Sequence, residues 1–320
     1  MYWLRKRLGS TGKPRLRILE KLAHFIPAET CHNLTIGLSH SELYALSEYW
    51  RMNEIPQHFS SRGNTDVLCQ IAWCGSALGD IACADDKHTD SALLKEAALF
   101  NLGIALFDTI AEEYPKKIIF LARALEPVRM KNRLLHPTSP EFSISCTQPE
   151  LNLIARLFDA VLSSVGLRLF NDKAHLVYLA DLLKKMYESE LRISNDPYLA
   201  KTLPIVFIGG LANHLHKHSI QMLFDNIAFF LCYWDDWLDL ATDMFHMAPN
   251  VFLGKPVLSQ PIQIIAYLYR CAMRVFGGSS LHKQFIGALE QPLKSALEIS
   301  SKINNVTYEK TISFFNYLLA

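Results

Sequence analysis

The chain has 320 residues, half of them hydrophobic, which is enough to bury a large core. Its 32 basic and 31 acidic residues leave a net charge of +1, which excludes a global electrostatic attraction to nucleic acid or to an anionic membrane. Any anion-binding site must therefore be local. The seven cysteines show no CxxC spacing, so they predict reduced thiols in a cytoplasmic protein rather than a disulfide framework.

The N-terminal segment, residues 1–30, is basic and contains no apolar stretch long enough for a secretory signal. Contact with a membrane surface and a role as a transit segment both stay open for it. The longest apolar run, residues 219–240, contains Asp225 and ends in a cluster of acids, so no transmembrane segment is predicted. Residues 31–320 are expected to form a single domain.

Helical periodicity dominates the chain, and strand patterns of useful length are nearly absent. The fold class is therefore predicted to be all-α. Residues 126–149 contain four prolines and are expected to be irregular, either as a surface loop of one bundle, which we favour, or as a linker between two helical halves. Helices are expected at residues 13–25, 41–50, 66–84, 90–113, 116–125, 150–169, 173–192, 197–216, 219–246, 260–276, 280–303 and 308–319.

Two of these helices end in acidic clusters. In the first, Asp108 and Glu112 are four residues apart, so both carboxylates project from one face, and Glu113 follows. In the second, the predicted helix at 219–246, the same spacing recurs twice and gives a stripe of three carboxylates with a fourth acid beside it. These four acids are Asp235, Asp239 and Asp243 in the stripe, and Asp236 next to it.

Stacked acids near a helix C-terminus are unfavourable, because like charges repel and the helix dipole is negative there. A single acid pair of this kind is usually a solvated face, but aromatic and aliphatic residues surround the second cluster. Mg²⁺ binds carboxylate and phosphate oxygens in octahedral geometry. The two clusters together therefore predict a site for Mg²⁺ and a diphosphate.

The clusters resemble the metal motifs of class I terpenoid and isoprenyl-diphosphate synthases. The sequence from Asp108 to Glu113 is similar to the first aspartate-rich motif, with Glu in place of Asp, and Asp235-Asp236-Trp237-Leu238-Asp239 looks like the second DDxxD motif. The 127 residues between Asp108 and Asp235 are also close to the separation in that family. The resemblance implies a helical bundle around a central active-site cavity and three Mg²⁺ ions as cofactors.

The resemblance also assigns roles to single residues. Asp108, Glu112, Asp235 and Asp239 would be catalytic, and metal ligation would involve these four together with Glu113, Asp236 and Asp243. Arg192, 43 residues before Asp235, matches the diphosphate-sensing arginine of terpene cyclases, and Phe107, Trp234 and Tyr317 would contact substrate. The chain departs from the family at Thr109, at Lys116 and Lys117 in place of an arginine pair, and at Tyr317, which has no neighbouring arginine.

These features lead to one main hypothesis and two rivals. The first is a Mg²⁺-dependent terpene synthase, a lyase that ionises a linear C10–C20 isoprenyl diphosphate and cyclises or rearranges the cation. The second is a prenyltransferase for chain elongation or head-to-head coupling, which the DDxxD form of the second motif favours. The third is a non-catalytic synthase-like subunit. The resemblance allows a homodimer, and no nucleic-acid partner is expected.

Overall fold

The computed structural model describes residues 63–83, 90–113, 115–191, 198–212, 218–246 and 280–319, and these residues contain helices and no strand. The all-α prediction is therefore confirmed for this part of the chain. The N-terminal segment 1–30 and the helices predicted at 13–25, 41–50 and 260–276 lie outside it. The elements are α5 (Gly63–Ala82), α6 (Ser91–Glu113), α7 (Pro115–Ala124), α8 (Pro127–Leu135), the short 3-10 helix η1 (Pro140–Phe142), α9 (Pro149–Arg168), α10 (Lys173–Glu190), α11 (Leu199–Leu211), α12 (His218–His246), α14 (Ser280–Ile303) and α15 (Asn305–Leu319).

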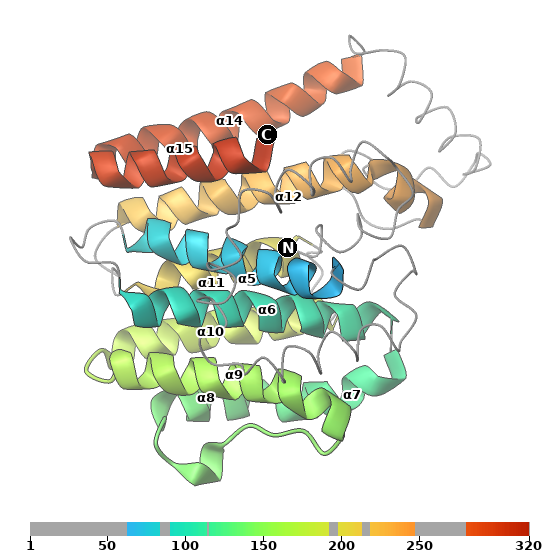
Figure 1. The fold of residues 1–320 in the computed structure, drawn as a ribbon, viewed down its shortest axis with the longest axis vertical. Helices are drawn as coiled ribbons and strands as arrows, with labels where there is room; N and C mark the ends of the chain where they lie inside the picture. Colours follow the sequence, from blue (N-terminus) through green and yellow to red (C-terminus); the bar gives the residue numbers. More distant parts are fainter. Residues whose placement is uncertain are drawn as a thin grey trace.

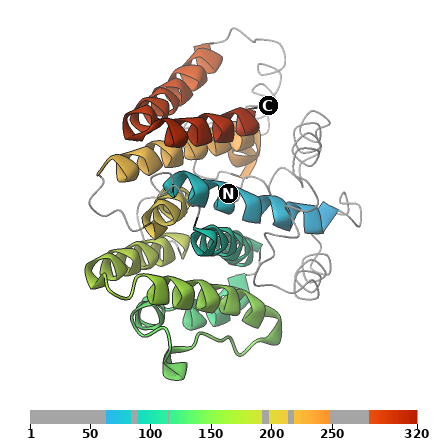
Figure 2. The same ribbon diagram turned by 60° about the vertical axis from the view of Figure 1, so that its left-hand side comes forward.

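The helices are stacked in layers with their axes roughly side by side (Figure 1). The α14–α15 pair covers α12, and α5 and α11 lie below α12. Next come α6 and α10, and the far margin is formed by α7, α8 and α9. The turned view keeps this order, with α6 seen nearly end-on in the middle of the stack (Figure 2).

The middle of helix α6 is buried on nearly all sides, because the helix packs against α5, α9 and α11. Phe100 lies at its centre and is 1% exposed. Its ring stacks on Phe207 of α11, with the centroids 4.1 Å apart, and meets Phe158 of α9 edge-on at 6.2 Å. One aromatic side chain therefore joins three helices, in the geometries that aromatic pairs prefer.

Helix α11 fits closely between α10 and α12 because two glycines stand at the contacts. A Cβ atom at Gly209 would collide with the ring of Phe224 on α12. A Cβ atom at Gly210 would lie 3.0 Å from the end of the Leu179 side chain on α10. The missing side chains allow the backbone of α11 to approach both neighbours.

Local signals fix several helix starts. Asp90 Oδ1 accepts hydrogen bonds from the backbone N–H groups of Ala92 at 2.9 Å and Leu93 at 3.4 Å, and Asp172 caps α10 in the same way. The prediction that residues 126–149 are irregular is wrong in part, because α8 and η1 form within this segment. The reason is that proline is favoured at the first position of a helix, where its missing N–H would have no partner in any case.

Among the described helices, none combines the length and the apolar character that crossing a membrane requires. Of the seven cysteines, Cys74, Cys83 and Cys146 are described as buried free thiols, in agreement with the prediction for them. Burial raises the pKa of the Cys74 thiol to about 12, so this side chain stays neutral and acts as part of the core.

Candidate functional site

The first acidic cluster lies in the last turns of α6. Asp108 is half-buried, and Asn101 and Ala97, seven and eleven residues earlier, occupy the same side of the helix. That side packs on α5: Asn101 donates a hydrogen bond to the carbonyl of Ile71, and Gly75 lies close to the backbone of Ala97. The row that ends in Asp108 therefore faces α5.

The second acidic cluster lies in the C-terminal half of α12, where the helical register places each acid on a row. Asp235 follows Ala228 by seven residues and Leu231 by four, and both are buried. Phe224, on the same row, packs against α11 at Gly209. Position 235 therefore continues the row of α12 that faces α11.

The other acids of this cluster diverge from that row. Asp239 follows the buried Cys232 by seven residues, so it stands near the edge of the buried side. Asp236 instead follows Phe229 by seven residues, and Phe229 is 51% exposed. The helical register thus places positions 235 and 239 on or next to rows that are buried earlier in α12, and position 236 on the row of the exposed Phe229.

The two acidic clusters lie at the same end of the bundle. Helices α6 and α12 run in the same direction, so their C-terminal ends are together on the right in Figure 1, although 127 residues separate Asp108 from Asp235. Helices α5 and α11 lie between α6 and α12, and they are the helices that the two acidic rows face. The fold brings the clusters to one end without making their helices direct neighbours along their length.

The structure describes the surroundings of only two predicted site residues, Asp108 and Phe107. Eight others lie on described helices, but their side chains are outside the described set: Glu112, Glu113, Trp234, Asp235, Asp236, Asp239, Asp243 and Tyr317. Arg192 lies outside the described residues altogether. The predicted ligands fit Mg²⁺ by chemical type, since all are carboxylates, and by their shared end of the bundle. Within the described side chains, no group of three His, Cys, Asp or Glu is placed to hold a metal ion.

An apolar pocket lies beside the last turns of α6, on the side of α8, α9 and α10, whereas the Asp108 row faces α5. It is formed by side chains of α6, α8, α9 and α10 together with Leu125. Phe107, a predicted substrate contact that is 3% exposed, lines it, and so does Ile104, one helical turn before Asp108. Glu190 is the single carboxylate in its described lining. The pocket thus offers an apolar surface within a turn of a metal-binding candidate.

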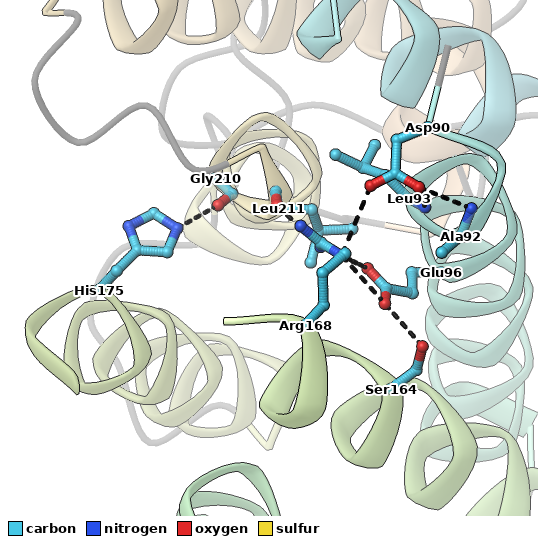
Figure 3. Close-up of polar contacts among 9 residues, drawn as sticks. All are labelled: Asp90, Ala92, Leu93, Glu96, Ser164, Arg168, His175, Gly210 and Leu211. Atoms are coloured by element: carbon cyan, nitrogen blue, oxygen red, sulfur yellow. Dashed lines mark hydrogen bonds and ion pairs between the residues drawn. The ribbon is translucent and has the colours of Figure 1, made fainter. Parts of the chain in front are cut away.

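A second polar group, which the sequence patterns did not single out, lies at the opposite end of α6. Glu96 is 1% exposed and stands twelve residues before Asp108, about 18 Å along the helix axis. Arg168 of α9 binds its Oε2 at 2.5 Å and also donates to the carbonyl of Leu211 at 2.9 Å (Figure 3). Ser164 donates to Glu96 Oε1 at 2.7 Å.

Burial raises the pKa of the Glu96 carboxyl above its ordinary value, while the hydrogen bonds from Arg168 and Ser164 and the charge of Arg168 act in the opposite direction. The group ties α6, α9 and α11 together, and His175 of α10 binds the carbonyl of Gly210 beside it (Figure 3). The hydrogen-bond donors and acceptors of this group bind one another, so we interpret the group as structural. In the sequence, its only signal is an acid within the apolar part of the helix, which is an unusual position for a charge.

Comparisons of this chain with protein-family models, with curated proteins and with solved structures give no match. The functional argument therefore rests on the chain's own residues and their placement.

Proposed function

We propose that the protein is a Mg²⁺-dependent class I terpene synthase that ionises a linear isoprenyl diphosphate of ten to twenty carbons. The observation that carries the proposal is the placement of two acidic clusters, far apart in sequence, at one end of an all-α bundle. Their rows face the helices that lie between them. Carboxylates gathered in this way suit a site in which several divalent cations and a diphosphate meet.

In this proposal Asp108 and Glu112 of α6 and Asp235, Asp239 and Asp243 of α12 would hold Mg²⁺, and Arg192 would bind the diphosphate. Bound Mg²⁺ would neutralise the leaving diphosphate. The apolar interior of the bundle would exclude water from an isoprenoid chain, because the described buried residues are mostly hydrophobic. Phe107, Trp234 and Tyr317 would provide aromatic surfaces, which attract cations through their rings.

The test is to incubate the purified protein with geranyl, farnesyl and geranylgeranyl diphosphates, with and without Mg²⁺, and to measure released diphosphate and product masses. Mg²⁺-dependent release of a cyclic or rearranged hydrocarbon or alcohol is expected. A coupled or elongated product would instead establish the prenyltransferase, which the DDxxD form of the second motif favours. No release from folded protein would favour the non-catalytic subunit.

A pair of variants on one helix separates metal binding from general effects. Asp239→Asn should lower the rate of diphosphate release by about 100-fold or more, since even indirect disturbance of metal ligands costs about 10- to 100-fold. Asp225→Asn is the matched control, because Asp225 is a half-buried acid of α12 that lies outside the cluster. Full activity of Asp239→Asn would contradict the metal assignment.

A further inference from the structure

Helices α7 and α8 carry a local excess of positive charge at the margin of the bundle opposite α14 and α15 (Figure 1). Residues 115–135 contain six basic residues and one acid, Glu126, in a chain whose total net charge is only +1. An excess of this kind creates a local field although the protein as a whole is nearly neutral.

Within the described residues, the basic side chains on the outer side of these helices have no ionic partners. Lys116, Arg123, Arg129 and Lys131 are all exposed, and none of them forms an ion pair within the part of the chain that the structure describes. Arg133 differs, because it turns inward and pairs with Asp159 of α9 at 2.9 Å. Four exposed cations therefore lie on the outer side of these two helices.

Large apolar side chains are exposed among these cations. Val128 is 68% exposed and Ile119 is 50% exposed, the former being the most exposed large hydrophobic side chain that the structure describes. Ile119 lies between Lys116 and Arg123 at spacings of three and four residues, so all three occupy one side of α7. Val128 and Lys131 share the outer side of α8 in the same way.

The inner sides of the same helices are ordinary core. Met130 and Leu134 of α8 are 4% and 0% exposed, and Leu121 of α7 is 0% exposed. Met130 and Leu125 also line the apolar pocket beside Phe107. Both helices are therefore held in place by the core. The exposure of their outer sides is thus not a result of poor packing.

We propose that the outer side of α7 and α8, defined by Lys116, Ile119, Arg123, Val128, Arg129 and Lys131, is a docking surface for an anionic lipid bilayer. Lipid phosphates and carboxylates would pair with the four cations. The aliphatic side chains would enter the boundary between headgroups and acyl chains. Single-stranded nucleic acid fits less well, because it binds to aromatic stacking surfaces, and the exposed apolar groups here are aliphatic. The proposal does not depend on the catalytic function proposed above.

The experiment measures flotation of the full-length protein with vesicles of phosphatidylcholine alone and of phosphatidylcholine mixed with phosphatidylserine, at low and at high salt. Binding should require phosphatidylserine and should weaken at high salt, because added ions screen exposed charges. The double variant R129E/K131E should lower the vesicle partition coefficient by at least about 20-fold, since each basic residue near an anionic surface contributes about fivefold.

Two matched controls lie on helices at the other margin. K294E/K302E changes the net charge by the same amount at two exposed positions of α14 and should leave the partition coefficient unchanged within about twofold. Val128→Ser should lower the coefficient by about three- to tenfold. Val306→Ser, at a valine of α15 that is 50% exposed, should not change it.

The circular dichroism spectrum and melting temperature of each variant check that it is folded. Glutamate at position 129 stands in the first turn of α8, where a negative charge is compatible with the helix dipole, so the double variant should fold. Equal binding to both vesicle types, or no binding to either, would overturn the proposal. An equal loss in the two double variants, or undiminished binding of R129E/K131E, would overturn it as well.

Discussion

Replacing Arg168 by methionine would leave the Glu96 carboxylate inside the bundle without its cation. Glu96 is 1% exposed, and of its two hydrogen-bonding partners only Ser164 would remain. Removing one partner of a buried ion pair costs about 3–5 kcal/mol, because the other charge stays desolvated. We expect Arg168→Met to lower the free energy of unfolding by about 3 kcal/mol at neutral pH, since Arg168 itself is 19% exposed and the site can admit some water.

The loss of stability in Arg168→Met should depend on pH, because it arises from the charge of the Glu96 carboxyl. Burial already raises the pKa of Glu96 in the folded protein, and removing Arg168 removes groups that lower it. Below the unfolded-state pKa of about 4.3, the carboxyl is protonated in both states and carries no charge penalty. As the pH rises from the unfolded-state pKa to the raised folded-state pKa, the penalty develops, and it is complete above the folded-state value. The variant should therefore be closer to the wild type in acid than at neutral or alkaline pH.

The assay is urea unfolding followed by circular dichroism, at about pH 4.5 and at about pH 8. The double variant E96Q/R168M should recover much of the lost stability, because it removes the buried charge. Lys302→Met is the matched control: it breaks the exposed Lys302–Glu298 pair of α14 and should have no measurable effect. A loss below about 1 kcal/mol for Arg168→Met, or an equal loss at both pH values, would refute this reasoning.

Three further predictions concern packing and capping, and urea unfolding tests each. Gly209→Ala should destabilise the protein by about 1–3 kcal/mol, because its Cβ would collide with the Phe224 ring. Gly210→Ala should cost less, since its Cβ would meet the end of a flexible leucine at 3.0 Å and Tyr178 at an ordinary contact distance of 3.6 Å. Equal effects would contradict the close approach of α11 to α12. Phe100→Ala should cost about 3–5 kcal/mol, because it opens a cavity between three helices, and a loss near zero would show that the centre of the bundle is packed differently. Asp172→Ala should lower the free energy of unfolding by about 1 kcal/mol, because the α10 cap is lost. Asp172→Asn should retain most of the stability, since asparagine also caps helices. Equal losses in the two variants would argue against capping.

Much of the fold follows from local sequence patterns. The predicted helices at 90–113, 173–192, 219–246 and 280–303 differ from α6, α10, α12 and α14 by no more than about two residues at each end, which is within the usual uncertainty of helix boundaries. Their apolar positions recur at helical spacing, and aspartates cap two of them. Such signals act over one or two turns, so the sequence displays them directly.

The prediction for residues 126–149 was wrong in part because of how its prolines are interpreted. The four prolines of residues 126–149 predict an irregular segment, yet Pro127, Pro140 and Pro149 each stand at the first position of a helix. Proline both ends one helix and suits the start of the next, and only the packing of α8 against α9 and α10 decided between these outcomes here.

For the candidate site, the sequence determined the acidic clusters, their spacing and the helices that carry them, because two carboxylates four residues apart on a helix must share a face. It could not determine that the two clusters lie at one end of the bundle, nor that α5 and α11 lie between their helices. It also could not predict that Glu96 pairs with Arg168, 72 residues away. Nor could it predict that the cations of α7 and α8 lie at one margin of the bundle. These features depend on which helices pack together, and that choice is made by complementary surfaces from distant parts of the chain, such as Phe100 against Phe207 and Gly209 against Phe224.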